Sequence, residues 1–559
     1  VVGFEWTAGN TANSIDKVFN KKRADDRKDW LGEYNRENYL DTNQPLIKYE
    51  EFVDREMIHF SKYDCDRSIP NLMDGLKISQ RKILYAAFKK RLTTEIKVAQ
   101  FSGYVSEHSA YHHGEASLNG AIVGMAQNFV GSNNINVMEP KGQFGTRLQG
   151  GKDSASERYI FTHLAGITRN IYRESDDKIL KYLDDDGYPV EPVYYAPIIP
   201  MLLVNGSKGI GTGFSTDIPC YNPLEIIRHI KVKLIDNTQS APVAFDGIPY
   251  YEGFKGTIAK QQDSAGNIEN NKFIIKGTYE FVGEDKIRIT ELPVGTWTDD
   301  YKLFLENQIA DKKSTIIKDF EDNSTECRVD ITIKCVKTGL QELKSKSGET
   351  TITDTASDTS TNDINEIEKY FKLTSKKTTT NMHAFTGEEK LKKYTNPNDI
   401  INDFFETRLQ VYKTRKAAQL EDSKAQLKRI SNKVKYIVGI LGDKIDLRRK
   451  KQTEINQTLT DFGLDKEDDS YNYLVKMPMD SVSEENIVKL KKEHQELTKF
   501  IQALEATKEE EIWLKELCEL EAEYEKYVMQ RKALDVEPEQ ASDKKSGKKS
   551  GKKTNKKVK

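Results

Sequence analysis

The longest hydrophobic pattern in the chain is helical and lies in its last third. Two runs of mostly apolar side chains advance by three and four residues, the spacing of one face of an α-helix. Between the runs, Asp461–Val482 contains Gly463, Pro478 and an apolar cluster. Over residues 396–530 we predict two long antiparallel helices with a globular tip. The runs are Leu427, Ile430, Val434, Ile437 and Leu441, then Leu490, His494, Leu497, Ile501 and Leu504; the cluster is Tyr471, Tyr473 and Leu474.

A period of two is typical of residues 240 to 390. Lys272–Phe281 alternates between apolar and polar positions, and Lys286–Ile289 follows a turn at Gly283–Asp285. Such alternation indicates half-buried strands, so we predict a β-rich domain over residues 191–395. Within it, Ser345–Asn362 is rich in serine, threonine and aspartate and poor in apolar residues. That composition predicts a flexible insertion.

Residues 51–190 favour shorter helices. Asp74–Lys82 reads as a turn that feeds an amphipathic helix continuing through Phe88, and further helical patterns cover Val98–Val105 and Ala116–Phe129. Two short helices joined by a glycine-containing turn commonly present side chains to a DNA groove. The whole chain is therefore expected to be an α+β multidomain protein.

Composition narrows the classes of protein. At 559 residues the chain should form several domains. Its net charge is −2 although 31% of residues are charged, so any nucleic-acid-binding surface must be local. The five cysteines are scattered without CxxC spacing, which favours a reducing compartment over a zinc site or a disulfide framework. No apolar run approaches the roughly 20 residues of a membrane span, so we expect no membrane partner. Because the chain starts at Val1 without a signal peptide, we expect a fragment.

The richest candidate chemistry lies in the glycine- and serine-rich loop Gly142–Tyr159. Arg147, Lys152 and Arg158 supply donors of the kind that hold phosphate. Beside Arg158, Tyr159 carries a phenol that can act as a nucleophile. A free tyrosine has a pKa near 10, so only about one molecule in a thousand is phenolate at neutral pH, and nucleophilic use requires nearby cations or a base. The alternative interpretation is that Tyr159 is simply the first core residue of the next element.

A pair of adjacent histidines, His112 and His113, lies in the segment Tyr111–Glu115. Neighbouring residues point in different directions on a helix or strand, and no cysteine is close in sequence, so a shared metal ion is not expected. Phosphate hydrogen bonding or proton transfer suits two imidazoles better.

These motifs together resemble the breakage-reunion region of eukaryotic-type DNA topoisomerase II. The resemblance covers residues 15 to 530, in the family's order and spacing. The sequence departs from the family at Ile78-Ser79, where Pro-Gly is usual, at Glu157, where proline is usual, and at Phe214, where tryptophan is usual. The matching segments are Arg67–Pro70, Asp74–Lys77, Gln80–Lys82, Lys97–Gln100, Tyr111–Glu115, Ala126–Asn134, Gly142–Thr162, Pro197–Met201, Asn205–Gly206, Gly209–Gly213 and Glu291–Thr298.

The resemblance implies roles for individual residues. Tyr159 would attack a DNA phosphodiester and keep the 5′ phosphate as a phosphotyrosine ester, with Arg158 as its phosphate-binding neighbour. Ile210, framed by Gly209 and Gly211, would enter between base pairs and kink the duplex, at a cost of a few kcal/mol per unstacked step; the alternative is a buried turn residue. The positions that match residues around the cleaved strand are Arg67, Lys77, Arg81, His112 and His113.

The resemblance also implies an architecture and partners. Residues 1–50 would close a Toprim region, 51–190 form a winged-helix domain, 191–395 a tower or shoulder domain, and 396–530 a coiled coil that makes the exit gate of a homodimer. The lysine-rich tail, 531–559, should be disordered and could bind DNA. The expected partners are double-stranded DNA and a second copy of the chain, in the nucleus or, for a viral enzyme, in a viral factory. Mg²⁺ and ATP would be held by domains outside this sequence, with no metal ligands in this chain, so the fragment should cleave poorly alone.

Three other hypotheses remain compatible with the sequence. An architectural protein that kept the scaffold and lost the chemistry would form no phosphotyrosine adduct. A structural coiled-coil dimer would bury Tyr159 away from both histidines. A tyrosine recombinase is a weaker alternative, because its Arg and His spacing differs.

Overall fold

The computed structural model describes residues 3–35, 37–41, 43–235, 245–262, 267–311, 316–347 and 364–534. These divide into two compact units. Unit 1 comprises residues 1–173, 180–405 and 517–559, and unit 2 comprises 174–179 and 406–516. The predicted flexible insertion falls mostly, and the tail 531–559 almost wholly, outside the described residues. Helices and strands are mixed throughout, which confirms the predicted α+β class. None of the helices in the described ranges is long and apolar enough to cross a membrane.

The first part of unit 1 is a small helical layer with one parallel strand pair. Trp30, Val53 and Cys65 are buried in its core. Cys65 and its neighbours lie on a regular helix that ends at Ser68, so Asp64 and Asp66 are helical residues. The elements are β1 (Gly3–Glu5), α1 (Asn10–Phe19), α2 (Ala24–Gly32), β2 (Leu46–Lys48), α3 (Tyr49–Phe52), the π-helical segment η1 (Val53–Met57) and α4 (Ile58–Ser68).

Three helices and a three-stranded sheet follow and carry most of the candidate residues. The sheet has the order β3-β5-β4, and all its pairings are antiparallel. Helix α5 begins at Ile78, where the Gln80 side chain accepts a hydrogen bond from the Lys77 amide, so the absence of Pro-Gly does not prevent the helix from starting. The elements are α5 (Ile78–Lys89), β3 (Ile96–Lys97), α6 (Val98–Ser109), α7 (Glu115–Ala126), β4 (Met138–Lys141), β5 (Phe161–Leu164), α8 (Thr168–Ile171), β6 (Tyr182–Asp185) and β7 (Tyr188–Pro192).

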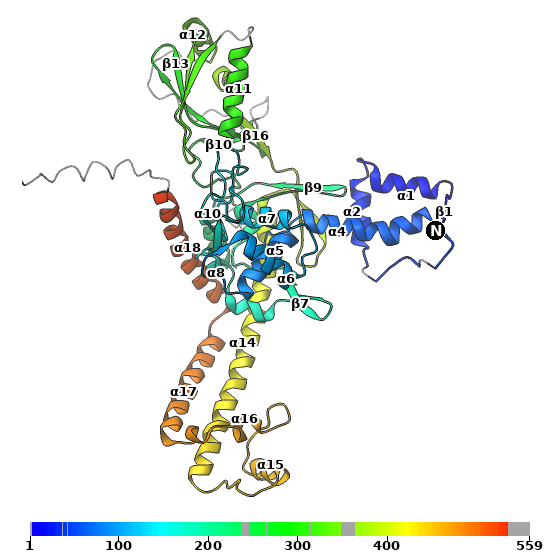
Figure 1. Ribbon diagram of the computed structural model, residues 1–559, viewed down its shortest axis with the longest axis vertical. Coiled ribbons are helices and arrows are strands. Elements are labelled where there is room, and N and C mark those ends of the chain that lie inside the picture. Colours follow the sequence, from blue (N-terminus) through cyan, green and yellow to red (C-terminus); the bar gives the residue numbers. More distant parts are fainter. Residues whose placement is uncertain are drawn as a thin grey trace, which may run out of the picture. The chain divides into compact units, whose positions relative to one another are not determined.

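The β-rich part of unit 1 confirms the alternating pattern. In β13 the side chains of Ile287 and Ile289 are buried while their neighbours are not, because successive side chains of a strand point to opposite faces. The four-stranded sheet has the order β12-β13-β15-β14 and lies beside α11 and α12 (Figure 1). The elements are α9 (Met201–Asn205), β8 (Ser207–Gly211), β9 (Phe214–Ile218), α10 (Pro223–Ile235), β10 (Thr257–Gln262), β11 (Ile268–Lys276), β12 (Thr278–Val282), β13 (Lys286–Glu291), α11 (Thr298–Ala310), β14 (Ile317–Asp322), β15 (Ile331–Cys335), α12 (Lys337–Lys346), α13 (Glu366–Tyr370), β16 (Thr374–Thr378), β17 (Met382–Phe385) and β18 (Leu391–Tyr394).

The predicted long helices are present. Helices α14 and α17 lie side by side in unit 2 (Figure 1), and an ion pair joins Lys424 to Glu505 at 2.7 Å. The tip has its own core, in which Tyr436, Leu459 and Leu474 are buried, so it begins earlier in the chain than the predicted Asp461. The elements are α14 (Pro397–Leu441), α15 (Gln452–Asp461), α16 (Asn472–Val475), η3 (Met479–Ser481), α17 (Glu484–Ala506) and α18 (Glu509–Leu534); a short 3₁₀ helix, η2 (Glu174–Ile179), also belongs to unit 2.

Candidate active site

Tyr159 points into solvent immediately before a core strand. Its side chain is 73% exposed, whereas the next residue, Ile160, is buried. The backbone on both sides is anchored to the start of α6: the Ala99 amide donates to the Glu157 carbonyl at 3.1 Å, and the Val98 amide donates to the Ile160 carbonyl at 3.0 Å. First-turn amides of a helix have no partner within the helix, so these bonds satisfy both chains. The structure therefore rejects a core role for Tyr159.

The loop that leads to Tyr159 is tightly folded. Gly145 has φ +95°, and a Cβ there would lie 2.5 Å from the carbonyl oxygen of Gly151. The Gln127 side chain donates to the carbonyls of Phe144 at 2.9 Å and Gly151 at 3.3 Å. These contacts require glycine at position 145 and hold the loop against α7.

Arg158 and Lys152 are exposed on this loop, but Arg147 is not. Its guanidinium is buried against Glu291, with one N–O distance of 2.5 Å, and Glu291 is 1% exposed. The predicted phosphate contact by Arg147 therefore has no surface from which to act. Glu291 begins the segment Glu291–Thr298, so the pair joins two of the segments that carried the resemblance.

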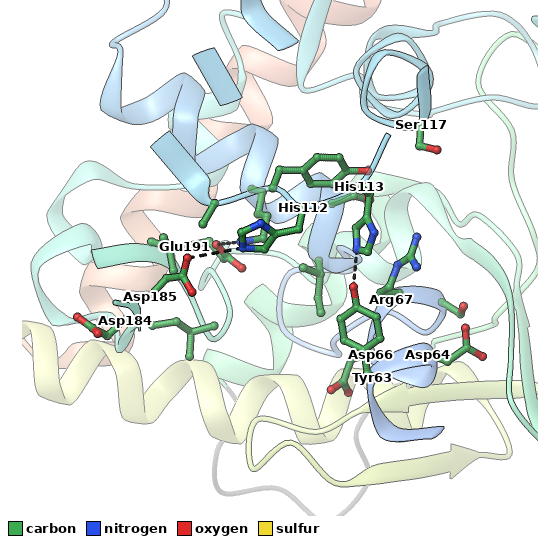
Figure 2. Close-up of a pocket in the computed structure, with 18 residues that line it drawn as sticks. Tyr63, Asp64, Asp66, Arg67, His112, His113, Ser117, Asp184, Asp185 and Glu191 are labelled. Carbon is green, nitrogen blue, oxygen red and sulfur yellow. Dashed lines mark hydrogen bonds and ion pairs between the residues drawn. The ribbon is translucent and has the colours of Figure 1, made fainter. Parts of the chain in front are cut away.

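The two histidines lie at a hollow of about 570 Å³ between α4, α5, the α6–α7 connection and the β6–β7 hairpin (Figure 2). Nε2 of His113 is 2.5 Å from the hydroxyl of Tyr63, and Nε2 of His112 is 3.8 Å from a carboxylate oxygen of Asp185. Partial burial lowers the pKa of His113, and the nearby charges of Arg67, His112 and Lys82 lower it further. His113 is therefore a neutral imidazole near neutral pH.

The three remaining basic candidates occupy different environments. Arg67 is exposed at the rim of the hollow, with its guanidinium 5.7 Å from the centre of the Tyr63 ring. Lys77 is half-buried and donates to the carbonyl of Lys208 at 2.8 Å, and burial lowers its pKa. Arg81 is buried and binds Asp74 through two nitrogens, at 2.7 and 3.1 Å. Like Arg147, Arg81 is a core ion pair, and its predicted DNA contact does not fit this position.

Ile210 is 79% exposed on strand β8, so the buried-turn alternative is excluded. The hairpin formed by β8 and β9 is pinned to the end of α4. A Cβ on Gly209 would lie 1.8 Å from the Ser68 carbonyl oxygen, so only glycine allows this approach. The bond from Lys77 to the Lys208 carbonyl fixes the same strand from the side of α5.

Within the part of the chain that the structure describes, no group of three or more His, Cys, Asp or Glu side chains could hold a metal ion. Asp64 accepts a hydrogen bond from Thr212 at 2.7 Å, and Asp66 pairs with Lys62 at 2.5 Å. These residues do not fit a Mg²⁺ site, and we derive no chemical step through a metal.

The structure thus groups the candidates in two places. Arg67, His112 and His113 line the hollow, whereas Tyr159, Arg158 and Lys152 share the loop. In the described ranges no hydrogen bond, ion pair or ring contact joins Tyr159 to either histidine. Sequence reasoning missed Tyr63, Lys82, Asp185 and Glu191, which also line the hollow. For Tyr63 a signal existed, since it precedes Arg67 by four residues on a helical pattern.

Comparison with known proteins identifies the family. A family model described as DNA gyrase/topoisomerase IV matches residues 67–518, and one described as the C-terminal associated domain of TOPRIM matches residues 1–65. The chain belongs to the DNA gyrase/topoisomerase IV family.

Within that family its similarity is to eukaryotic enzymes, as the motifs predicted. It is 38% identical over 561 residues to DNA topoisomerase 2 of Arabidopsis thaliana and 40% identical over 559 residues to that of Plasmodium falciparum. These alignments cover 94% and 93% of this chain but 36% and 37% of the relatives, so the chain spans little more than a third of their length.

A solved structure agrees. The crystal structure of the Plasmodium falciparum topoisomerase II DNA-binding, cleavage and re-ligation domain is 38% identical, with a TM-score of 0.82 over 96% of this chain and 72% of that one. The match to the TOPRIM-associated domain also agrees with the expectation that the first residues close a Toprim region. The predicted resemblance and fold class are therefore confirmed.

Proposed function

We propose that this chain is the DNA-cleaving and rejoining part of a type II topoisomerase. The Tyr159 oxygen attacks a backbone phosphorus, the bond from phosphorus to the 3′ oxygen breaks, and a 5′-phosphotyrosine ester and a free 3′ hydroxyl result. The reverse attack by that hydroxyl restores the strand. One phosphoester replaces another, so rejoining needs no external energy. The observation that carries the proposal is the anchored loop that presents Tyr159 and Arg158 to solvent.

Charge on the transferring phosphate increases in the transition state, and preplaced cations stabilise it. Arg158 and Lys152 are exposed beside the nucleophile, and Arg67 is exposed at the hollow. We assign these three, with His112, His113 and Lys77, to the DNA backbone. Arg81 and Arg147 are left out, because a buried guanidinium that already binds a carboxylate cannot reach a phosphate.

Ile210 supports a bent duplex. An apolar side chain that is almost fully exposed on a pinned hairpin gains by leaving water, and a base step opened by bending offers it an apolar site. In the proposal the wedge acts while Tyr159 cuts the strand. Two chains would form the complete enzyme, one Tyr159 cutting each strand, with the tip of unit 2 meeting its twin. Mg²⁺ and ATP belong in this proposal to parts of the enzyme outside the sequence described.

The test is Tyr159→Phe in the full-length enzyme, assayed for covalent protein–DNA adducts trapped with detergent and for DNA binding at several salt concentrations. Adducts should disappear while binding is unchanged. Tyr188→Phe is the matched control, because Tyr188 is 75% exposed and also lies in unit 1. Adducts formed by the Tyr159→Phe enzyme would refute the assignment. A wild-type enzyme that binds and bends DNA without any adduct would instead support an architectural protein.

A further inference from the structure

The contact between Tyr63 and His113 joins two elements at the hollow. Tyr63 lies on α4 and His113 on the connection between α6 and α7, and 2.5 Å separates the phenol oxygen from Nε2 (Figure 2). Tyr111 packs edge-on against the same imidazole, with ring centres 5.3 Å apart at 81°. The ring of His113 is therefore held from two sides, but only Tyr63 contacts one of its nitrogens among the described residues.

The charges around His113 determine which hydrogen-bonding groups it offers. Arg67, His112 and Lys82 place positive charge near the ring and favour its neutral form. The carboxylates at the hollow are engaged elsewhere: Glu191 by Lys82 at 2.8 Å, Asp66 by Lys62, Asp64 by Thr212, and Asp185 faces His112. A neutral imidazole has one N–H donor and one acceptor nitrogen.

We propose that Tyr63 is a positioning residue that donates its hydroxyl proton to Nε2 of His113 and so keeps the ring proton on Nδ1, where it can be donated to a phosphate oxygen. The hydrogen bond made by one ring nitrogen sets the role of the other. An imidazole without this bond exchanges between two tautomers, and in one of them Nδ1 presents a lone pair that repels phosphate. The consequence for DNA cleavage rests on the proposed function, whereas the tautomer does not.

The size of the effect follows from the exposure of the pair. Tyr63 is 44% exposed, so water competes for both groups and the bond has the modest net strength of a neutral hydrogen bond. Such a bond sustains a preference of about three- to tenfold between the tautomers. Tyr63→Phe removes only the hydroxyl and keeps the ring beneath Arg67. We expect its cleavage rate to fall by the same factor of about three to ten.

The tautomer can be read directly by ¹⁵N NMR of the imidazole nitrogens in this chain, which has eight histidines. At pH 8 the wild-type His113 should show a protonated Nδ1 and an unprotonated Nε2, and Tyr63→Phe should give averaged shifts. Tyr104→Phe is the matched control, because Tyr104 stacks on His108 at 3.9 Å through its ring. A protonated Nε2 in the wild-type chain, or the same His113 shifts in Tyr63→Phe, would overturn the proposal.

The second measurement is single-turnover cleavage by the full-length enzyme carrying Tyr63→Phe or Tyr104→Phe. A slower rate for Tyr63→Phe alone, with unchanged DNA affinity, supports positioning. An unchanged rate despite altered His113 shifts overturns the role in the reaction. If the wild-type enzyme forms no adduct, the proposed function fails, and the NMR result still decides the tautomer.

Discussion

Replacing Arg147 separates a structural role from a phosphate contact. Arg147→Met keeps most of the apolar stem and removes the guanidinium, which leaves the carboxylate of Glu291 buried without its cation. Removing one partner of a buried ion pair costs about 3 to 5 kcal/mol. Glu291 also accepts hydrogen bonds from the amides of Leu292 at 2.9 Å and Lys255 at 3.1 Å, which continue to stabilise its charge. We therefore expect a loss at the lower end, about 3 kcal/mol.

Thermal unfolding measures this loss. A change of 1 kcal/mol shifts the melting temperature of a large domain by about 2 °C, so Arg147→Met should melt about 6 °C lower. Adding Glu291→Gln should recover most of the difference, because a neutral amide costs much less to bury than an unpaired carboxylate. Recovery in the double variant would attribute the loss to the stranded charge rather than to lost packing.

DNA binding at several salt concentrations provides the contrast. Each phosphate contact contributes about 0.9 to the slope of log K against log salt concentration. Lys152→Ala, on the same loop but exposed, should lower that slope by about 0.9 and leave the melting temperature unchanged. Arg147→Met should leave the slope unchanged. The reasoning is refuted if Arg147→Met melts like the wild-type chain and loses slope as Lys152→Ala does.

Three further predictions concern buried ionisable groups. In unit 2, Asp176→Asn should destabilise the chain to urea by about 3 kcal/mol, because Arg408, which is 0% exposed, loses its charge partner at 2.8 Å. Burial lowers the pKa of His383, so the unfolded state binds more protons below the ordinary value of about 6.5. Urea midpoints should therefore fall as pH drops through 6.5, and His383→Gln should flatten that slope. Native-state iodoacetamide labelling followed by mass spectrometry should modify two thiols rapidly and three only after unfolding, because burial raises the pKa of the three to about 12; the first group is Cys327 and Cys518, the second Cys65, Cys220 and Cys335.

The fold was predictable where the pattern is local. Alternation marks β13 because Ile287 and Ile289 face one core, and steps of three and four mark α14 because Ile430 and Val434 pack against the tip core. The start of the tip was not predictable, because Tyr436 joins its core only after the chain has closed on itself. Periodicity identifies the face that is buried but does not identify the partner that covers it.

The site divides along the same line. Tyr159 and Arg158 could be found from the sequence, because the loop and the strand after it are contiguous. Arg81 and Arg147 look like phosphate ligands in sequence, yet both are core ion pairs. The partner of Arg81, Asp74, lies 7 residues away, but the partner of Arg147, Glu291, lies 144 residues away. No local pattern reports such a pairing, so the charge of a residue does not indicate whether it faces solvent.

The anchoring of Tyr159 has a consequence for strand rejoining. A covalent ester can be reversed efficiently only if the cut end stays close to the position from which the free 3′ hydroxyl attacks, since misplacement by about 1 Å can cost a factor of about 100 in rate. The backbone around Tyr159 is tied to α6 by the amides of Val98 and Ala99, and Phe161 continues as β5, the middle strand of its sheet. Only the side chain is free to move. The same fixed backbone that exposes the phenol would thus hold the esterified DNA end in place, which makes cleavage and rejoining two directions of one geometry.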